Sequence, residues 1–219
     1  MNSAMYAVQW LGEQMTGSAE AAGFSNEDDV ADYITQMRRE EYWDLLDIRG
    51  IPTGRIARRA TDGSPGGSLL HPGDWHRVVQ VCVFNSRGEM LIQLRSQNKA
   101  DWPGVWDLSA GGSVLAGETS GQGASRELFE EVGIEHDFTD QRPDFVLSIQ
   151  QGFFDVYVTE WNGDLLSLNL QIEEVKDIRW VTQSQLITMI DEGSFYPYPT
   201  SLIDLIFTIH DQPESVQSI

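Results

Sequence analysis

The chain has 219 residues, a formal net charge of −20 at pH 7 and 41% hydrophobic residues. This length and hydrophobic content suit one globular domain with extensions, and the acidity argues against a nucleic-acid polymer as partner because such binding depends on basic patches. No apolar stretch approaches the roughly 18 residues that span a membrane, and the first residues lack the Lys or Arg of a secretory signal. We therefore expect no membrane partner.

The charged residues are distributed unevenly along the chain. Residues 1–37 hold six acidic residues and residues 180–219 hold five, and neither segment contains Lys or Arg. Any cationic contact with a phosphate must therefore come from the central part of the chain. The single cysteine, Cys82, lies in the apolar run V-V-Q-V-C-V-F, which excludes an internal disulfide and predicts a buried thiol in a reducing, cytoplasmic compartment.

The chain is expected to divide into three parts. Residues 1–40 form an acidic N-terminal extension that is partly helical, because a segment with early acids ends in Arg38 and Arg39, which suits a helix dipole. Residues 41–210 form the main domain, which opens with a hairpin at 41–59. The last residues, 211–219, form a C-terminal tail.

Within the main domain, strand and helix signals alternate. Period-two runs bounded by turn residues predict strands, and longer runs of period 3.6 predict helices. This order of strands, helix, strands and helices indicates an α/β protein, an α/β/α sandwich with a mixed β-sheet. The expected strands are at 76–85, 90–95, 144–150, 153–160 and 176–181, and the expected helices lie between residues 119 and 133, at 183–192 and at 200–209.

The segment from 111 to 134 predicts a loop, a helix and a stop. The pair Gly111-Gly112 suits a loop that needs close backbone approach, Thr119 or Ser120 can cap the helix N-terminus, and Gly133 suits the left-handed position after its last turn. Apolar residues at steps of four are expected to pack against a sheet. They are Ala124, Leu128 and Val132.

Three carboxylates crowd one turn of this predicted helix. Glu127, Glu130 and Glu131 repel one another, and they lie near the helix C-terminus, where the dipole also disfavours negative charge. Glutamates on a helix are most often a solvated face. The alternative is a divalent hard cation such as Mg²⁺, which takes oxygen ligands and often combines carboxylates with substrate phosphates.

The surrounding residues favour the metal interpretation. Residues 112–134 fit the pattern G-x5-E-x7-R-E-U-x-E-E-x-G-U at every fixed position, and this pattern is the signature of the Nudix hydrolases, which the chain resembles. The resemblance implies hydrolysis of a diphosphate linkage to another moiety, with Mg²⁺ or Mn²⁺ as cofactor. The matching residues are Gly112, Glu118, Arg126, Glu127, Leu128, Glu130, Glu131, Gly133 and Ile134.

The resemblance also implies roles for individual residues. The metal ligands would be Glu127, Glu130, Glu131 and the backbone carbonyl of Gly111, and Glu118 would lie nearby or on an additional metal. Glu130 and Glu131 would be catalytic. Arg126 is either an ordinary surface pair with Glu130 four residues later or, as the resemblance implies, a residue that holds a catalytic glutamate in place.

The general base is harder to assign. It could be a glutamate of the motif or a carboxylate on a later loop, where Glu174 and its neighbour Glu173 are candidates, with solvated loop acids as an equal alternative. Glu160 is a weaker candidate. Arg95 and Lys99, just before the motif, match positions that contact phosphate in relatives, and the alternative for them is a surface charge pair at a strand end.

The hairpin at 41–59 and the run from 75 to 88 resemble the branch of Nudix proteins that is similar to isopentenyl-diphosphate isomerase. The resemblance covers roughly residues 41–190. Isomerase activity is not implied, because the catalytic cysteine is replaced by the segment Leu108-Ser109-Ala110 and Cys82 is too early to substitute. His76 would match a metal-site histidine of the isomerases, although a lone histidine at a strand start is more often structural.

The sequence leaves the substrate and one alternative function open. The substrate is a small-molecule diphosphate, either a nucleoside diphosphate derivative or a related compound, and a homodimer is left open. The alternative is a Nudix-fold binding or regulatory module without turnover, which the intact glutamates disfavour. Several aromatic residues could stack on a nucleobase, although most of them are expected to be core. They are Trp102, Trp106, Phe153, Phe154 and Tyr157.

Overall fold

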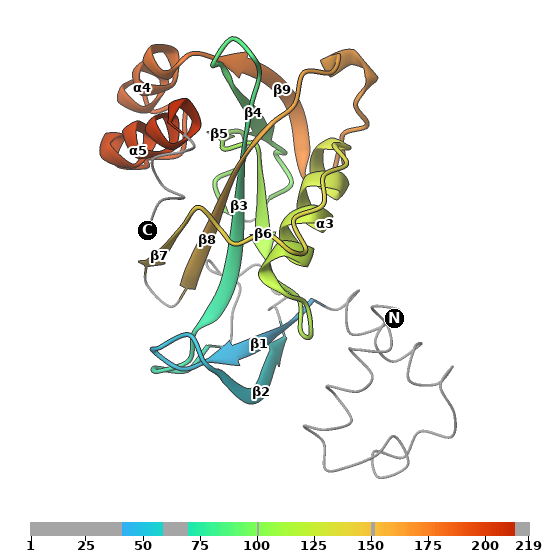
Figure 1. Ribbon diagram of the computed structural model, residues 1–219, viewed down its shortest axis with the longest axis vertical. Coiled ribbons are helices and arrows are strands. Elements are labelled where there is room, and N and C mark those ends of the chain that lie inside the picture. Colours follow the sequence, from blue (N-terminus) through green and yellow to red (C-terminus); the bar gives the residue numbers. More distant parts are fainter. Residues whose placement is uncertain (1–40, 59–69, 100, 150–151, 213–219) are drawn as a thin grey trace.

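The computed structural model describes residues 41–58, 70–99, 101–149 and 152–212 (Figure 1). The expected acidic extension at 1–40, with its predicted helix, lies outside the described residues, as does the tail from 213 onward. Within the described residues, no helix is long and apolar enough to cross a membrane.

The N-terminal hairpin is present as predicted over the residues described. Strands β1 (Tyr42–Leu46) and β2 (Pro52–Arg58) pair in antiparallel fashion as a separate two-stranded sheet. The hairpin also holds the loop that precedes the glutamate helix, because Ala116 N–H donates to the Tyr42 carbonyl at 2.7 Å and Gly117 N–H donates to Asp44 Oδ2 at 2.9 Å.

The main sheet has seven strands in the order β5-β4-β3-β8-β7, with β6 paired to β3 and β9 paired to β4. Strands β3 and β8 are parallel and the other pairs are antiparallel, so the sheet is mixed as expected. The strands are β3 (His76–Phe84), β4 (Met90–Arg95), β5 (Trp106–Asp107), β6 (Ala110–Ser113), β7 (Phe145–Ile149), β8 (Gly152–Glu160) and β9 (Val175–Val181).

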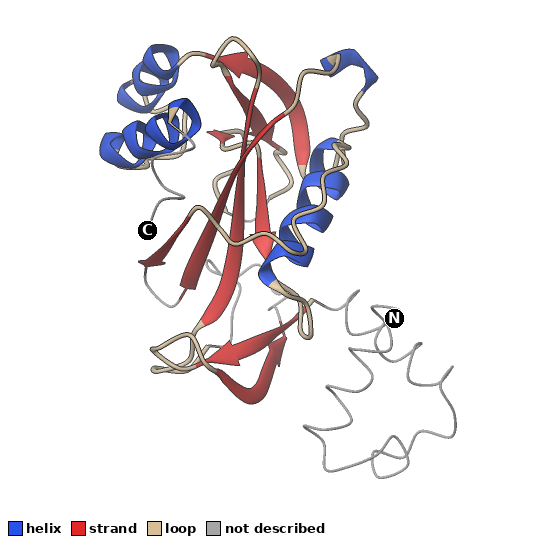
Figure 2. Cartoon of the chain, viewed as in Figure 1, coloured by secondary structure: helices blue, strands red, loops and turns tan. Residues whose placement is uncertain are grey.

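Helices cover both faces of this sheet, which confirms the predicted α/β/α sandwich (Figures 1 and 2). Helix α3 (Ser120–Val132) packs on one face, and α4 (Gln183–Asp191) and α5 (Thr200–Asp211) pack on the other. A short 3-10 turn, η1 (Leu165–Ser167), follows β8.

Strand β3 shows how alternation builds two cores. Val81 and Val83 lie in the cluster with Leu128 of α3, whereas Cys82 and Phe84 lie in the cluster beneath α4 and α5. Successive side chains of a strand point to opposite faces, so one strand supplies both. Cys82 is fully buried as predicted, and this burial raises the pKa of its thiol.

One predicted element is wrong. The expected loop at Gly111-Gly112 is strand β6, which pairs with β3 through Val79 opposite Gly112 and Gln80 opposite Gly111. Close approach is nevertheless the reason for glycine, because a Cβ on Gly112 would lie 2.3 Å from Glu127 Oε1. The backbone is therefore extended, and the missing side chain leaves room for a carboxylate.

Helix α3 begins and ends as its sequence predicts. Thr119 is the N-cap, and its hydroxyl and the Gln122 side chain satisfy each other's backbone N–H groups in a capping box. Gly133 adopts φ 76°, and its N–H donates to the Phe129 carbonyl at 2.9 Å. The helix is regular from its first turn, where the buried Gly121 lies directly against the backbone of Phe138.

Candidate active site

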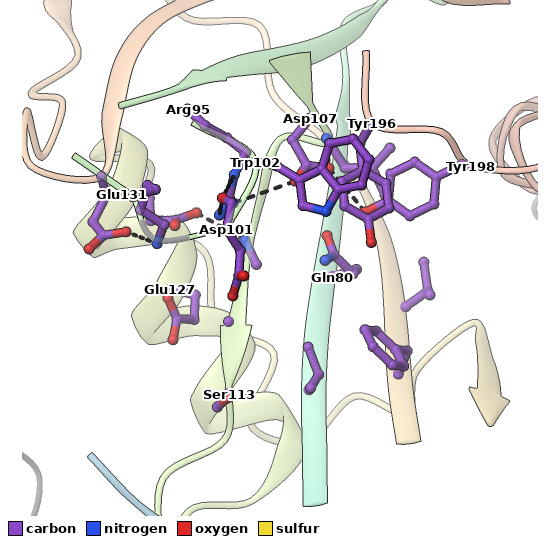
Figure 3. A pocket seen from close by; sticks show the side chains of 18 of the residues that line it. Gln80, Arg95, Asp101, Trp102, Asp107, Ser113, Glu127, Glu131, Tyr196 and Tyr198 are labelled. Carbon is purple, nitrogen blue, oxygen red and sulfur yellow. Dashed lines mark hydrogen bonds and ion pairs between the residues drawn. The ribbon is translucent and has the colours of Figure 1, made fainter. Parts of the chain in front are cut away.

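A cleft of about 1080 Å³ opens where strands β3 and β4 separate. These strands pair at Phe84 and Met90 beside their turn, and further along β3 pairs with β6 while β4 pairs with β5 and β9. We call the two parts of the cleft the glutamate end (Gly111, Gly112, Arg126, Glu127, Glu130 and Glu131) and the aromatic end (Trp102, Tyr196 and Tyr198). Figure 3 shows them on opposite sides of the opening.

At the glutamate end, one face of α3 presents its carboxylates to β4 and β6. Glu131 is 4% exposed, and its Oε2 accepts hydrogen bonds at 3.0 Å from both Gln93 Nε2 on β4 and the Gly111 N–H on β6. Glu127 lies against Gly112, and Glu130 is more exposed. The structure therefore brings together the three predicted glutamates and Gly111.

Arg126 braces this group of acids. Its guanidinium donates to Glu118 Oε1 at 3.0 Å, to Glu127 Oε1 at 2.8 Å and to Glu130 Oε2 at 3.2 Å. It also donates to the Ser113 carbonyl at 3.0 Å, which ties the helix to the end of β6. Although burial disfavours its charged form, the neighbouring Glu127 and Glu118 raise the pKa of Arg126 above its ordinary value.

Burial determines the protonation of the two inner glutamates. Burial raises the pKa of Glu131 to about 8, with Glu127 adding to the shift and the Gly111 N–H opposing it. Burial also raises the pKa of Glu127, although the Arg126 charge acts in the opposite direction. The glutamate end therefore holds more carboxylates than its cation can neutralise.

The donors at this end suit a hard divalent cation, because they are carboxylate oxygens beside a backbone carbonyl and a glycine that leaves space for them. Among the described residues, no group of three or more His, Cys, Asp or Glu side chains is already arranged to hold a metal ion. A bound cation would take oxygens that Arg126, Gln93 and the Gly111 N–H now occupy. The donor chemistry fits the expected metal, and the present hydrogen bonds hold the ligands near it.

Two of the candidate residues outside the helix, Lys99 and Glu174, form an ion pair in the cleft. Lys99 Nζ donates to Glu174 Oε2, and both side chains are largely buried. Glu174 is fixed by its backbone, since the Ser96 N–H donates to its carbonyl at 2.8 Å. The pairing of a predicted phosphate contact with a predicted base was not expected from the sequence.

Arg95, the other predicted phosphate contact, lines the cleft but is engaged internally. Its guanidinium donates to the Asp101 carbonyl at 2.9 Å through Nη2 and lies 3.5 Å from Asp107 Oδ2. Asp107 also accepts a hydrogen bond from the Tyr198 hydroxyl at 3.0 Å. Burial raises the pKa of Asp107, with Arg95 opposing, and burial together with Asp107 raises the pKa of Tyr198.

Other predicted residues are spread more widely. Glu118 is held by Arg126, and Glu160 lies 3.3 Å from His210 Nε2 at the end of β8. His76 stacks on Trp43 with ring centroids 4.5 Å apart, and both residues line the cleft. Glu173 is exposed and does not line the cleft.

Two of the five aromatic candidates, Trp102 and Phe154, line the cleft. Trp106 lies under the Arg179 guanidinium at 4.3 Å, and Phe153 packs on Trp75. Tyr157 is buried beneath α3.

The sequence reasoning missed several cleft residues. Tyr196 and Tyr198 come from the segment between α4 and α5, where the pattern Y-P-Y-P between two helices was a usable signal. Gln93 lies in an apolar strand, where one polar residue facing inward was the signal. Gln80 in the apolar run of β3 offered the same signal, whereas Asp107 offered none.

The structure also describes the segment Leu108-Ser109-Ala110, which stands where the isomerases carry their catalytic cysteine. Ser109 is fully buried, its hydroxyl donates to the Leu91 carbonyl at 2.6 Å, and it accepts from the Val83 N–H at 2.8 Å. A side chain so enclosed and so bonded joins neighbouring strands and does not face the cleft. Ser109 is therefore a structural residue, and the segment contains no cysteine.

Fold and site together define an α/β/α protein whose glutamate helix faces a cleft suited to a phosphate ligand. Residues 74–200 match the NUDIX domain, and the chain is 43% identical over 158 residues to an uncharacterised Nudix hydrolase of Listeria monocytogenes, covering 72% of this chain and 89% of that one. The chain belongs to the Nudix hydrolase family, which supports action on a pyrophosphate-type linkage.

Two further likenesses place the chain within the family. It is 31% identical over 164 residues to an isopentenyl-diphosphate Delta-isomerase of Corynebacterium diphtheriae, covering 69% of this chain and 84% of that one. A crystal structure of a Deinococcus radiodurans protein matches with a TM-score of 0.56 at 25% identity, covering 76% of this chain and 97% of that one. The expected likeness to the isomerase branch is thus confirmed.

Proposed function

We propose that this protein hydrolyses a diphosphate linkage in a nucleoside diphosphate derivative or a related small molecule and depends on Mg²⁺ or Mn²⁺. One observation carries the proposal: Glu127, Glu130 and Glu131 lie at one end of a cleft that also contains the Lys99–Glu174 pair. The glutamates can bind the metal and the lysine can contact the phosphate oxygens, so the cleft offers both kinds of group that a diphosphate with its metal requires.

The metal would be held by Glu127, Glu130, Glu131 and the Gly111 carbonyl. When bound, it supplies neutralisation of the diphosphate charge and a lower pKa for a coordinated water. The protein itself orients these ligands: Arg126 fixes Glu127 and Glu130, and Gln93 with the Gly111 N–H fixes Glu131.

Lys99 and Glu174 supply the remaining groups. Lys99 is the proposed phosphate contact and Glu174 the proposed proton acceptor. Their ion pair links the two roles, because a phosphate that takes the Lys99 ammonium releases Glu174 Oε2 from its hydrogen bond. The proposed base is therefore available when the substrate is in place.

The test is a substrate screen on the purified full-length protein. Nucleoside diphosphates, sugar nucleotides, dinucleotides and isopentenyl diphosphate are incubated with Mg²⁺, and phosphate or monophosphate products are measured, with EDTA as the metal-free control. We expect Mg²⁺-dependent release from at least one class. Binding of a compound in the presence of Mg²⁺ without turnover of any compound would replace this proposal with a ligand-binding module.

The proposed partner is the small-molecule substrate, in a cytoplasmic setting and without a nucleic-acid polymer. The net charge of −20 supports this, because such acidity opposes binding to a polyanion unless the charge is locally neutralised.

A further inference from the structure

The aromatic end contains an exposed tryptophan in a strained backbone conformation. Trp102 is 47% exposed and has φ of 51°, in the left-handed region that bulky residues rarely adopt. Such a conformation costs about 1–3 kcal/mol and persists where the surroundings enforce it, often at ligand sites. An indole exposed in this way does not contribute to the hydrophobic core.

Hydrogen bonds on both sides of Trp102 enforce this conformation. Arg95 donates twice to the carbonyl of Asp101, the residue before Trp102, and the Gly104 N–H returns to the Arg95 carbonyl at 3.2 Å. Asp107 stands beside the same guanidinium. The turn that carries Trp102 is thus fastened to β4 on both sides of the indole.

The opposite ring comes from a distant part of the chain. Tyr196 lies with its ring centroid 5.0 Å from that of Trp102, tilted by 56°, and its N–H donates to the Trp106 carbonyl at 2.8 Å. Tyr198 is 4.6 Å from Tyr196, centroid to centroid, and donates its hydroxyl to Asp107. Figure 3 shows these rings grouped around Asp107.

Asp107 therefore fixes both aromatic segments. Through Arg95 it holds the turn of Trp102, and through Tyr198 it holds the segment of Tyr196. Asp107 is paired with one guanidinium and one hydroxyl, whereas several glutamates share the guanidinium of Arg126. The two rings are tilted by 56° and do not stack face to face, Trp102 is 47% exposed, and both residues line the cleft.

We propose that Trp102 and Tyr196 form a stacking surface for the planar base of a nucleoside diphosphate derivative, and that Asp107 is the positioning residue of this surface. The proposal rests on the proposed function and selects one substrate class within it. Stacking on an aromatic side chain tolerates any base, because every base has a π-face, and it is worth about a tenfold change in affinity or more. The aromatic end thus selects the class of substrate rather than one base.

The test compares ADP with isopentenyl diphosphate, which carries the same linkage without a ring. We expect Trp102→Ala to raise KM for ADP about tenfold with kcat within about threefold, and to leave KM for isopentenyl diphosphate unchanged. Trp102→Phe should restore most of the affinity, whereas Trp102→Leu, apolar but without a ring, should resemble the alanine variant.

Other outcomes overturn the inference separately from the function. If the wild type hydrolyses ADP but Trp102→Leu matches Trp102→Phe, or if Trp102→Ala raises both KM values equally, the contact is apolar and not stacking. If the wild type hydrolyses only isopentenyl diphosphate, the substrate class is wrong although a hydrolase remains. Absence of all turnover would contradict the proposed function itself.

The positioning role of Asp107 is tested by a measurement that a purely structural residue would not change. We expect Asp107→Asn to raise KM for ADP severalfold, to spare KM for isopentenyl diphosphate, and to add little further when combined with Trp102→Ala, because both act through one surface. Fully additive effects, or an equal rise for both substrates, would remove the positioning role.

Discussion

The two ends of the cleft treat their carboxylates in opposite ways. At the glutamate end, the guanidinium of Arg126 is shared among several acids, and Glu131 accepts hydrogen bonds from uncharged donors. At the aromatic end, Asp107 is paired with Arg95, whose guanidinium also donates to the Asp101 carbonyl, and it accepts from the Tyr198 hydroxyl. The acids of the glutamate end outnumber the guanidinium beside them, so this end is suited to a ligand that brings positive charge and to chemistry. Asp107 is paired with a cation, and this pairing fixes the geometry of the aromatic end, which is suited to recognition.

The strongest test of this comparison removes one charge from the glutamate end while keeping its shape. Glu130→Gln and Glu131→Gln should each lower kcat about 100-fold or more, because each removes a proposed metal ligand. In Glu131→Gln, the amide oxygen can still accept from Gln93 and the Gly111 N–H, so folding should be preserved. Steady-state kinetics with Mg²⁺ and a urea melt measure the two effects.

Glu135→Gln is the matched control, because Glu135 is exposed and follows the same helix. It should leave both quantities unchanged. Wild-type activity in either Glu130→Gln or Glu131→Gln would contradict the assignment of these residues as metal ligands.

The second largest effect should be on stability. Arg126→Ala leaves Glu118 and Glu127 buried without their cation, so we expect the free energy of unfolding to fall by about 3 kcal/mol. Urea denaturation measures this. Arg87→Ala, which breaks an exposed pair with Glu89, should cost less than about 1 kcal/mol. Equal losses in the two variants would mean that Arg126 is an ordinary surface residue.

Two glycines separate stability from activity: Gly121 lies in the first turn of α3, and Gly112 lies at the glutamate end. A Cβ on Gly121 would lie 2.1 Å from the backbone oxygen of Phe138, so Gly121→Ala should cost about 2 kcal/mol of unfolding free energy. On Gly112 the Cβ would meet the flexible carboxylate of Glu127, so Gly112→Ala should lower activity with a smaller loss of stability. Thermal melts and kinetics on both variants measure these effects. A large loss of stability in Gly112→Ala with unchanged activity would refute the close approach of Glu127 to β6.

A further expected effect is on how the stability of the metal-free protein depends on pH. Because burial raises the pKa of Glu131 to about 8, the folded state binds a proton that the unfolded chain releases near pH 4.5. Stability from this group is complete below about pH 4.5 and is lost as pH rises through about 8. Urea midpoints across this window, measured in EDTA, should fall, and Glu131→Gln should flatten the decline.

Mg²⁺ provides the check on that slope. Since metal ligands must be deprotonated, Mg²⁺ should stabilise the protein more at pH 8 than at pH 5. The same pH series on Glu135→Gln should keep the decline of the wild type between pH 5 and 8, because Glu135 is exposed and Glu131 is unaltered. A decline that survives Glu131→Gln would place its source elsewhere.

The glutamate end was predictable because its information is local. Residues 111–134 carry the cap at Thr119, the stop at Gly133 and the glutamates at fixed spacing, and helical periodicity places them on one face. The same periodicity predicted α4 and α5 closely. What failed there was β6, since two glycines read as a loop when their lack of Cβ instead lets a strand lie under Glu127.

The contacts of the aromatic end were not predictable because they join distant residues, although Trp102 was itself a candidate. Tyr198 and Asp107 are separated by 91 positions, and nothing near either residue signals the other. The Lys99–Glu174 pair is separated by 75 positions and was likewise unexpected, although each residue was a candidate alone. Contacts of this kind depend on how strands and loops meet in the folded sheet.

One oxygen of Glu131 has a role beyond charge. Strands β4 and β6 are each paired elsewhere in the sheet, and Glu131 Oε2 joins them by accepting from Gln93 on one and Gly111 on the other. The side chain of a helix residue thus links two strands that are not paired with each other in the sheet. Because a cation bound to that oxygen would compete with both hydrogen bonds, loading the site would also change how the two strands are joined.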